Sequence, residues 1–273
     1  MSDSASPLAA LRRTIAALDR GKPRWDSDFF CTGHGGLDTA LGGGLARGRV
    51  HELVCAEEEA GAGAGMALLL ARLATRADDV APLLWLRLDA ASRQGGAPYG
   101  PGLAALGIDP GRLLLGTMTD EAMLLQAGLD AVRCPGLGAV MIECRGRHRL
   151  LDLTASRRLA LAAEASGVTA LLLLVGGVPG PSAAETRWQV AAAPSAPLAG
   201  DAPGHGAFDL TLLRRRAGPD GMRWRLEWRA TEGVFGEWSG GQGGQQQHGR
   251  EGAALSGAVV SIPAARPAAD RAA

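Results

Sequence analysis

A stretch of small residues after the first long apolar run has the spacing of a phosphate-binding site. It follows Val50–Cys55 and reads AGAGAGMA from Ala60 to Ala67. The P-loop pattern is G-x-x-x-x-G-K-[ST], whose backbone N–H groups and helix N-terminus hold phosphate. Met66 takes the place of the lysine, and Ala67 that of the hydroxyl that binds Mg²⁺. The glycines of the frame are Gly61, Gly63 and Gly65. The segment therefore has the frame of a nucleotide loop without its chemistry.

No other position supplies the missing lysine. Lys22 is the only lysine among the 28 basic residues, and it precedes Pro23 with no strand or glycine loop before it. The acidic run Glu57–Glu59 lies where phosphates would approach, and like charges repel. We therefore expect a vestigial site, with no nucleotide cofactor, no tight ATP binding and no ATP hydrolysis.

One carboxylate stands at the end of another apolar run. Ala139–Ile142 ends directly before Glu143, at the place where P-loop proteins carry the acid that binds Mg²⁺. Glutamate is longer than the usual aspartate and could coordinate the metal through water. In the competing interpretation this acid caps the strand or pairs with Arg145 or Arg147. The sequence leaves both interpretations open.

Two arginine-containing stretches are candidates for binding single-stranded DNA. Arg145 and Arg147 directly follow the apolar run that ends at Ile142. Arg187 stands beside Trp188 within residues 176–206, which are rich in Pro, Ser and Gly and predict a long irregular loop. An arginine can contact a phosphate while a neighbouring tryptophan stacks on a base. Alternatively, Trp188 anchors the loop and the arginines cover solvated faces.

The other reactive residue types show no catalytic or metal-binding pattern. The five histidines are scattered, none at metal-ligand spacing from another histidine or a cysteine, and no G-x-S-x-G motif occurs. The cysteines form no C-x-x-C pair and lie mostly in or beside apolar runs, which indicates buried free thiols. They are Cys31, Cys55, Cys134 and Cys144. We expect no metal site.

Composition excludes several classes of protein. A chain of 273 residues can hold one sizeable domain with extensions. Its formal net charge of zero provides no overall field toward nucleic acid or membrane. The first residues are acidic before any basic region, unlike a signal peptide. The longest apolar runs, such as Val168–Val175, are too short to cross a bilayer. We expect a cytoplasmic protein.

Periodicity divides the chain into three predicted regions. In residues 1–30, apolar positions at helical spacing predict an amphipathic helix, which packs on its own domain or binds a partner, followed by a linker. Residues 31–238 form the predicted core domain. Residues 239–273 are rich in Gly, Gln, Ala and Pro, which predicts a disordered tail.

The core domain reads as an α/β fold. Its strands are continuous apolar runs that alternate with helices, which predicts a mainly parallel sheet covered on both faces. The predicted strands are Val50–Cys55, Leu83–Leu88, Leu113–Leu115, Ala139–Ile142 and Thr169–Val175. The predicted helices are Met66–Thr75, Leu103–Leu106, Glu121–Arg133 and Leu151–Ser166.

The end of the core domain changes to strict alternation of apolar and polar residues. Such alternation on both sides of the turn sequence at 217–221 predicts an antiparallel hairpin. Trp224, Leu226 and Trp228 form its apolar face. The basic face carries Arg223, Arg225 and Arg229.

A run of residues before the glycine-rich segment makes a family resemblance specific. Residues 32–53 resemble the segment that introduces the P-loop in RecA-type recombinases. The degenerate loop after it resembles that of the ImuA family, RecA-like accessory proteins of bacterial damage-induced mutagenesis. The matching residues are Thr32-Gly33, Leu37-Asp38, Leu41-Gly42-Gly43-Gly44-Leu45, Arg47-Gly48-Arg49 and Glu52-Leu53. The resemblance covers approximately residues 30–230 and implies a RecA-like core.

The resemblance also assigns family positions to single residues. The catalytic glutamate of RecA-type proteins falls at Ala91, two residues after Asp89. The family's adenine-stacking tyrosine falls near Tyr99, the only tyrosine of the chain. Residues 176–206 and the segment after Glu143 fall at the two DNA-facing loops. Together these positions imply a RecA-like core that has lost its ATP chemistry.

What the resemblance implies about function is membership of a DNA-damage-inducible complex for error-prone translesion synthesis. The chain would be a non-catalytic accessory protein that acts through contacts with an ImuB-type adaptor, a RecA filament and an error-prone polymerase. Two alternatives stay open. One is a DNA-dependent ATPase or nucleotide switch, against which the missing lysine argues. The other is a cell-division inhibitor resembling SulA, although such proteins are shorter and largely lack the glycine-rich tail.

Overall fold

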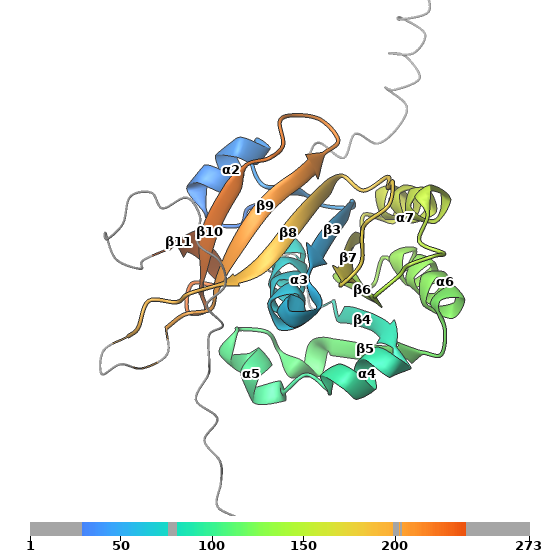
Figure 1. The fold of residues 1–273 in the computed structure, drawn as a ribbon, viewed down its shortest axis with the longest axis horizontal. Coiled ribbons are helices and arrows are strands. Elements are labelled where there is room, and N and C mark those ends of the chain that lie inside the picture. The colour runs from blue at the N-terminus through green and yellow to red at the C-terminus, as the bar shows by residue number, and fades with distance from the viewer. Residues whose placement is uncertain (1–28, 76–80, 199–201, 203, 239–273) are drawn as a thin grey trace, which may run out of the picture. The chain divides into compact units, whose positions relative to one another are not determined.

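A nine-stranded sheet organises the computed structural model, which describes residues 29–75, 81–198, 202 and 204–238 (Figure 1). Its strand order is β11-β10-β9-β8-β3-β7-β6-β4-β5. The strands from β8 to β5 run parallel, and β9, β10 and β11 continue the sheet antiparallel beyond β8. The strands are β3 (Val50–Cys55), β4 (Leu83–Leu88), β5 (Leu113–Met118), β6 (Ala139–Arg145), β7 (Thr169–Val175), β8 (Thr186–Ala193), β9 (Ala207–Arg215), β10 (Arg223–Arg229) and β11 (Val234–Glu237).

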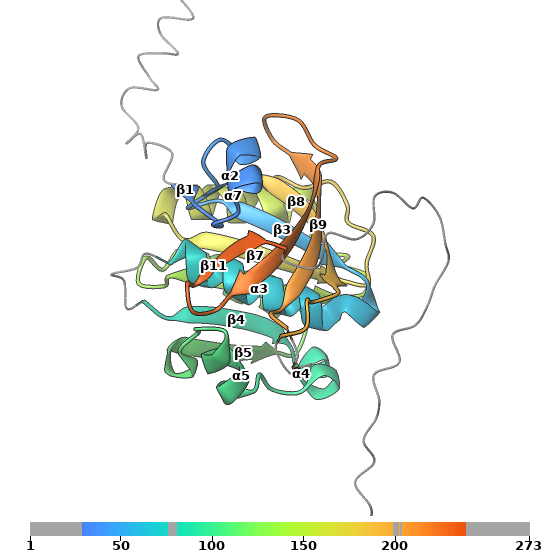
Figure 2. The ribbon, with the colours of Figure 1, turned by 90° about the vertical axis from the view of Figure 1, so that its left-hand side faces the viewer.

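Helices cover both faces of the parallel part of the sheet (Figures 1 and 2). Helix α3 packs on one face, against β3, β6 and β7, and helices α6 and α7 pack on the other. The helices are α2 (Gly35–Leu41), α3 (Ala60–Ala74), α4 (Asp89–Gly95), α5 (Gly100–Ala105), α6 (Glu121–Val132) and α7 (Leu153–Ser166). Of the two 3₁₀ turns, η1 (Glu57–Glu59) connects β3 to α3, and η2 (Pro110–Arg112) precedes β5.

Strand β7 shows why the parallel strands are apolar throughout. Leu171 and Leu173 face the α3 side, whereas Leu172 and Leu174 face the α6 and α7 side. Successive side chains of a strand point to opposite faces, so a strand covered on both faces needs apolar residues at every position. The continuous apolar runs predicted from the sequence follow directly from this two-sided burial.

The segment that carries the RecA resemblance folds around one aspartate. Asp38, in α2, accepts hydrogen bonds at Oδ1 from the backbone N (2.9 Å) and Oγ1 (2.8 Å) of Thr32 and at Oδ2 from Gly33 N (3.0 Å). Gly42 ends α2 with φ of 78°, in the left-handed region that glycine adopts without strain. The chain then returns to pair β2 (Leu45–Ala46) antiparallel with β1 (Phe29–Phe30). This motif therefore serves to position the chain where β3 begins.

The α/β RecA-like architecture predicted from the sequence is confirmed. All five predicted strands are present, with β5 and β6 extending beyond their predicted ends to Met118 and Arg145. Helix α3 begins at Ala60, six residues before the predicted start. Residues 1–28, which include the predicted amphipathic helix, and the predicted tail in residues 239–273 lie outside the described residues.

The prediction of an irregular loop over residues 176–206 is wrong in its middle part. Strand β8 (Thr186–Ala193) lies there and pairs parallel with β3 and antiparallel with β9. Thr186, Trp188 and Val190 are buried while Gln189 is exposed, so the period of a strand was present in the sequence. The surrounding Pro, Ser and Gly residues concealed it.

The predicted antiparallel hairpin is confirmed in strands β9 and β10. Leu226 and Trp228 are buried in the core on the α3 side, and Trp224 packs against that core partly buried. On the opposite face, the Arg225 guanidinium donates to both carboxylate oxygens of Asp209, at 2.7 and 2.8 Å. The apolar and charged faces therefore alternate as the sequence predicts.

Candidate functional site

The candidate site lies where β3, β4 and β6 end near the start of α3. In an open α/β sheet, ligands bind outside the carboxyl ends of the parallel strands. Here β3 leads through η1 straight into α3, so Gly61, Gly63 and Gly65 are helical residues. The turns of a helix occupy the segment in which the sequence predicts a glycine-rich phosphate loop.

Gly63 is explained by close packing of α3 on the sheet. A Cβ atom at this position would lie 2.6 Å from Cys55 Sγ and 2.9 Å from Leu173 Cδ1. A Cβ at Gly61 would meet nothing within 4 Å, and one at Gly65 would meet only the Phe208 ring at 3.8 Å. The helix therefore requires a glycine at position 63 in order to approach β3 and β7.

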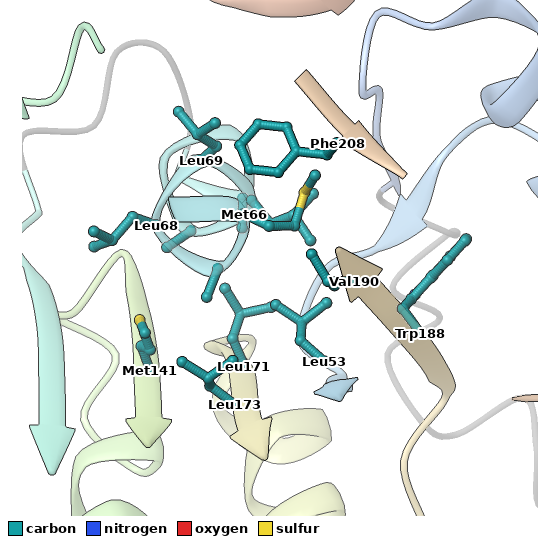
Figure 3. Close-up of a cluster of buried hydrophobic side chains, with 14 of the residues drawn as sticks. Leu53, Met66, Leu68, Leu69, Met141, Leu171, Leu173, Trp188, Val190 and Phe208 are labelled. Carbon is teal, nitrogen blue, oxygen red and sulfur yellow. The ribbon is translucent and has the colours of Figure 1, made fainter. Parts of the chain in front are cut away.

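Met66 lies in the core and does not face a phosphate position. Its side chain is fully buried, in the same cluster as Val190 of β8 and Phe208 of β9 (Figure 3). The residue that takes the place of the P-loop lysine in the sequence therefore faces the core. The physical reason is the early start of α3, which puts residue 66 in the second turn of the helix and turns its side chain inward. Ala67, at the position of the Mg²⁺-binding hydroxyl, is also fully buried.

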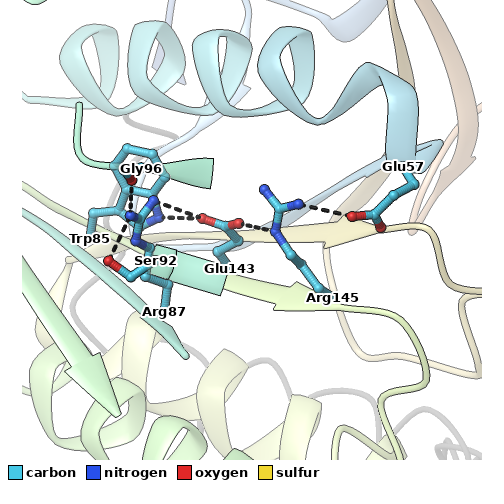
Figure 4. Close-up of polar contacts among 7 residues, drawn as sticks. All are labelled: Glu57, Trp85, Arg87, Ser92, Gly96, Glu143 and Arg145. Atoms are coloured by element: carbon cyan, nitrogen blue, oxygen red, sulfur yellow. Dashed lines mark hydrogen bonds and ion pairs between the residues drawn. The ribbon is translucent and has the colours of Figure 1, made fainter. Parts of the chain in front are cut away.

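Glu143 is held by two donors at the end of β6 (Figure 4). Its side chain is 1% exposed. Arg145 Nε donates to Glu143 Oε1 at 2.7 Å, and Trp85 Nε1 donates to Oε2 at 3.0 Å. Of the two interpretations open at the sequence level, pairing with Arg145 is the one the structure shows. Arg147, the other predicted partner, has an exposed side chain.

The pairing of Glu143 extends across the site to the acidic run. Arg145 Nη1 donates to Glu57 Oε1 at 2.9 Å, so one guanidinium joins two carboxylates from elements far apart in the sequence. Burial alone would lower the pKa of Arg145. The hydrogen bonds and charges of Glu143 and Glu57 have the larger effect together, so the pKa of Arg145 is raised. We call Glu57, Arg145, Glu143, Trp85 and Arg87 the charge network.

Arg87 and Trp85 are the members that the sequence analysis missed. Arg87 lies opposite Glu143 in the register of β4 and β6, with its Nη1 atom 4.0 Å from Glu143 Oε2. It donates to Ser92 Oγ at 2.9 Å and to the carbonyl oxygen of Gly96, and it lies over the Trp85 ring at 5.0 Å. The sequence did contain a clue to Arg87, because it is the single charged residue in the apolar run Leu83–Leu88, and a buried arginine implies an acidic partner.

The acidic run therefore stabilises contacts within the fold. Besides the pairing of Glu57 with Arg145, Glu59 Oε2 accepts a hydrogen bond from Ala192 N of β8 at 2.8 Å. Gly176, which follows β7, has φ of 69°, and a Cβ there would lie 2.6 Å from Glu57 Oε2. Both carboxylates thus tie the turn before α3 to neighbouring strands.

The family positions assigned by resemblance, Ala91 and Tyr99, are not members of the charge network, although α4 contacts it through Ser92. Ala91 is a buried residue of α4, and Asp89 pairs with Arg93 at 2.6 Å on the surface of the same helix. Tyr99 precedes α5 and exposes 74% of its surface. The predicted role of Tyr99 in stacking adenine stays a prediction.

Trp188 and Arg187, predicted as DNA-binding residues, are structural in this fold. Trp188 is 2% exposed and donates through Nε1 to Thr186 Oγ1 at 2.7 Å. Arg187 Nε lies 2.5 Å from Oε2 of the buried Glu52. The correction follows from β8, because a strand in the sheet points Trp188 into the core and Arg187 toward the adjacent β3. The Trp188 ring is closed to a nucleic-acid base.

The loop after β6 presents the remaining basic residues. Arg147 and Arg149 are exposed, and His148 between them is partly buried, which lowers its pKa. This loop touches the loop after β7, because a Cβ at Gly177 would lie 2.8 Å from His148 Nε2. The structure therefore brings the two predicted DNA-facing loops together, with Arg147 and Arg149 outward.

The cysteines are only partly as predicted, and the described residues offer no metal site. Cys55 and Cys144 are buried free thiols, and burial raises the pKa of Cys55 to about 11 and that of Cys144 to about 12. Cys31 and Cys134 are exposed, contrary to the prediction. Among residues 29–75, 81–198 and 204–238, no three His, Cys, Asp or Glu side chains gather closely enough to hold a metal ion. No described helix is long and apolar enough to span a membrane.

Comparison with known proteins identifies relatives in sequence and in fold. The chain is 32% identical over 208 residues to Protein ImuA of Caulobacter vibrioides, in strain NA1000 / CB15N and in strain ATCC 19089 / CIP 103742 / CB 15. The match covers 69% of this chain and 74% of each relative. No family model matches the chain.

A solved structure shares the fold. The RadB recombinase superimposes with a TM-score of 0.52 at 14% identity, over 77% of this chain and 99% of that one. Similarity at this level shows the fold alone, which agrees with the parallel sheet and the helices described above. The identity to the Caulobacter proteins, and the share of their length that it covers, show that the chain belongs to the ImuA family.

Proposed function

We propose that this chain is a non-catalytic, RecA-like accessory protein of an inducible complex for error-prone translesion synthesis, acting in the cytoplasm through protein contacts. Membership of the ImuA family supports the mutagenesis context. The charge network is the observation that supports the loss of catalysis. Glu143 and Glu57, the acids nearest to where phosphates would approach, share Arg145 as their common partner.

Two features of the site oppose nucleotide binding: the missing phosphate and metal ligands, and the acidic residues before α3. A P-loop lysine and a metal-binding hydroxyl each provide charge-assisted contacts of about 1.5–3 kcal/mol. At the corresponding positions, Met66 and Ala67 are buried apolar side chains. A phosphate near the start of α3 would also meet Glu57 and Glu58. We therefore expect no micromolar binding of Mg-ATP.

Isothermal titration calorimetry with Mg-ATP tests this part of the proposal. At a protein concentration of about 100 μM we expect no detectable heat of binding, which corresponds to a Kd of roughly 1 mM or weaker. Micromolar affinity would favour the alternative, a DNA-dependent ATPase or nucleotide switch. A steady-state ATPase assay with and without single-stranded DNA then separates a switch from an enzyme.

The proposed partners are an ImuB-type adaptor, a RecA filament and an error-prone polymerase. A pull-down with this chain from cells exposed to a DNA-damaging agent, followed by reconstitution with each purified partner, tests the assignment. Recovery of at least one of the three supports it. Recovery of a cell-division protein in their place would favour the SulA-like alternative.

A second candidate function is direct contact with single-stranded DNA at the loop after β6. The observation that favours it is the pair of exposed arginines, Arg147 and Arg149, on a loop that abuts the loop after β7. Arginines that neutralise phosphates give binding that weakens as salt increases. Fluorescence anisotropy with a labelled oligonucleotide measures this directly.

A matched pair of double variants locates the DNA contact. Arg147→Ala with Arg149→Ala removes two exposed charges from the loop. Arg157→Ala with Arg158→Ala removes two exposed charges from α7. Weaker DNA binding in the first variant alone supports contact at the loop, whereas equal weakening in both would indicate only a general electrostatic attraction.

A further inference from the structure

Helix α7 presents two leucines to solvent on the face that points away from the sheet. It packs on the sheet beside α6 (Figure 1). Its buried residues are Ser156, Leu159, Ala162 and Ala163. On the outer face, Leu153 and Leu161 are 51% and 59% exposed. Eight residues separate these two, so they lie about 12 Å apart along the helix axis. Single exposed leucines are ordinary, but two aligned on one helix face form a possible contact surface.

Two arginines lie on the same outer face of α7. Arg157 stands between the leucines, because positions 153, 157 and 161 follow one another at intervals of four residues and form a line along the helix. Arg158 adjoins it. Both arginine side chains are exposed, and within the described part of the chain neither forms an ion pair. We call Leu153, Arg157, Arg158 and Leu161 the α7 surface.

The acidic residues of α7 and its N-cap are engaged elsewhere. Asp152 caps the helix, and its Oδ1 accepts a hydrogen bond from Ala155 N at 2.7 Å. Glu164 Oε2 pairs with Arg49 Nη1 at 3.0 Å. Neither carboxylate is paired with Arg157 or Arg158. The α7 surface therefore combines two apolar contacts with two free positive charges, which favours a partner that is apolar and acidic.

A second copy of this chain fits the α7 surface poorly. Antiparallel packing of two α7 helices about a twofold axis would bring Leu153 of each copy against Leu161 of the other. The same packing would bring the two Arg157 guanidinium groups together at the centre, and like charges that meet in an interface oppose association. A nucleic acid would use the arginines alone, because its phosphates offer nothing to the leucines. An acidic protein segment uses all four residues.

We propose that the α7 surface binds an acidic amphipathic helix of a partner protein. The apolar residues of that helix pack against Leu153 and Leu161, and its aspartate or glutamate residues pair with Arg157 and Arg158. The inference rests on the proposed function in one respect, which is that this chain acts through protein contacts. It does not depend on which partner supplies the helix.

Synthetic peptides test the proposal on the full chain. The probe is a fluorescein-labelled peptide of about 15 residues, long enough to form a helix, with leucines on one face and glutamates beside them. One comparison peptide carries lysine in place of glutamate, and another carries alanine in place of leucine. By fluorescence anisotropy we expect the probe to bind with a Kd on the order of 100 μM or tighter, and the other two at least about tenfold more weakly. No binding of the probe at about 1 mM would overturn the proposal.

Substitution of the leucines, with a matched control, locates the binding surface. Leu153→Gln with Leu161→Gln keeps good helix formers and should weaken binding of the probe at least about tenfold. Leu114→Gln with Leu115→Gln removes two leucines of β5, each 48% exposed, and should leave binding unchanged. Thermal unfolding checks that both variants fold. Full affinity in the α7 variant, or an equal loss in both, would overturn the proposal.

Reversal of the charges gives an independent test. Arg157→Glu with Arg158→Glu should weaken binding of the glutamate probe at least about tenfold and strengthen binding of the lysine peptide by a similar factor. Arg216→Glu with Arg223→Glu makes the same change of net charge at two exposed positions of another surface, and it should alter neither affinity. A gain for the lysine peptide requires a folded protein, so its absence would overturn the proposed charge pairing.

Two comparisons separate this inference from nucleic-acid binding and from the proposed function. An oligonucleotide that binds more tightly than the probe, and loses affinity on charge reversal but not in the glutamine variant, would assign the α7 surface to nucleic acid and overturn the proposal. Recovery of a mutagenesis partner in the pull-down, without binding of the probe, would overturn this inference alone. Binding of the probe that requires the α7 surface, without recovery of any such partner, would contradict the proposed function alone.

Discussion

Arg145 and Glu143 stand two residues apart on β6 and pair through Nε and Oε1 at 2.7 Å, because alternate residues of a strand share one face of the sheet. The same face carries Trp85 and Arg87 on the adjacent β4. A strand-end acid that binds Mg²⁺ in active P-loop proteins is here enclosed by donors from its own sheet. A structural role of Glu143 can therefore be tested by measuring the free energy of unfolding of a Glu143 variant.

Glu143→Gln should lower the free energy of unfolding by about 2–3 kcal/mol. The substitution keeps the shape of the side chain but removes a buried negative charge that faces Arg145 and Arg87. Urea unfolding followed by tryptophan fluorescence measures the change. Glu58→Gln is the matched control, since Glu58 is exposed in the same acidic run, and it should change stability by less than about 0.5 kcal/mol. Equal effects in the two variants would refute a structural role for Glu143.

The stability of the fold should fall as pH decreases from 6.5 toward 4 because of His51. Burial lowers the pKa of His51 to about 4, with a smaller opposing effect from its hydrogen bond to Ala46 O and a further lowering by Arg49. Between these pH values the unfolded chain binds a proton that the folded chain does not. Stability therefore rises with pH through this window, by about 3 kcal/mol in total for this group.

Urea unfolding at several pH values, repeated in two variants, isolates this contribution. His51→Gln should flatten the slope between pH 4 and 6.5 because it removes the titrating group. His205→Gln, at an exposed position, should leave the slope as in the unsubstituted chain. An unchanged slope in His51→Gln would contradict a neutral, buried His51.

The parallel strands and the terminal hairpin were predictable because their burial leaves a regular pattern. In β7, seven consecutive buried residues correspond to a continuous apolar run. In β10, the alternation of Trp224, Leu226 and Trp228 with arginines corresponds to one covered face. Strand β8 was missed because the surrounding Pro, Ser and Gly residues predict a loop. The neighbours in space of Trp188 and Arg187, which are Trp224 and Glu52, are distant in the sequence.

The charge network was only half predictable for the same reason. Pairing of Glu143 with Arg145 spans two residues and was among the alternatives weighed from the sequence. The link from Arg145 to Glu57 spans 88 residues, and it exists only because β3 and β6 flank β7 in the sheet. Sequence spacing carries no signal for such a contact.

Met66→Lys should destabilise the fold by about 3–5 kcal/mol and should not create an ATP site. Residue 66 is fully buried beside Phe208 and Val190, so a lysine there would be an uncompensated charge in an apolar core. Met66→Leu is the control and should cost less than about 1.5 kcal/mol, since it conserves volume. Thermal unfolding and calorimetry with Mg-ATP check both parts. A stable Met66→Lys variant that binds ATP would show that the phosphate position is retained.

Trp228→Ala should destabilise the fold by about 3–5 kcal/mol, more than Arg225→Gln on the charged face of the same strand. Trp228 is 1% exposed, donates through Nε1 to Leu106 O at 3.1 Å and meets the Phe235 ring at 4.9 Å. Arg225→Gln removes an ion pair whose partners are 38% and 43% exposed, so its effect should stay within about 1 kcal/mol. Urea unfolding of both variants gives the comparison. Similar losses would mean that the antiparallel strands do not depend on the core beneath them, which would contradict the packing of β10 against α3.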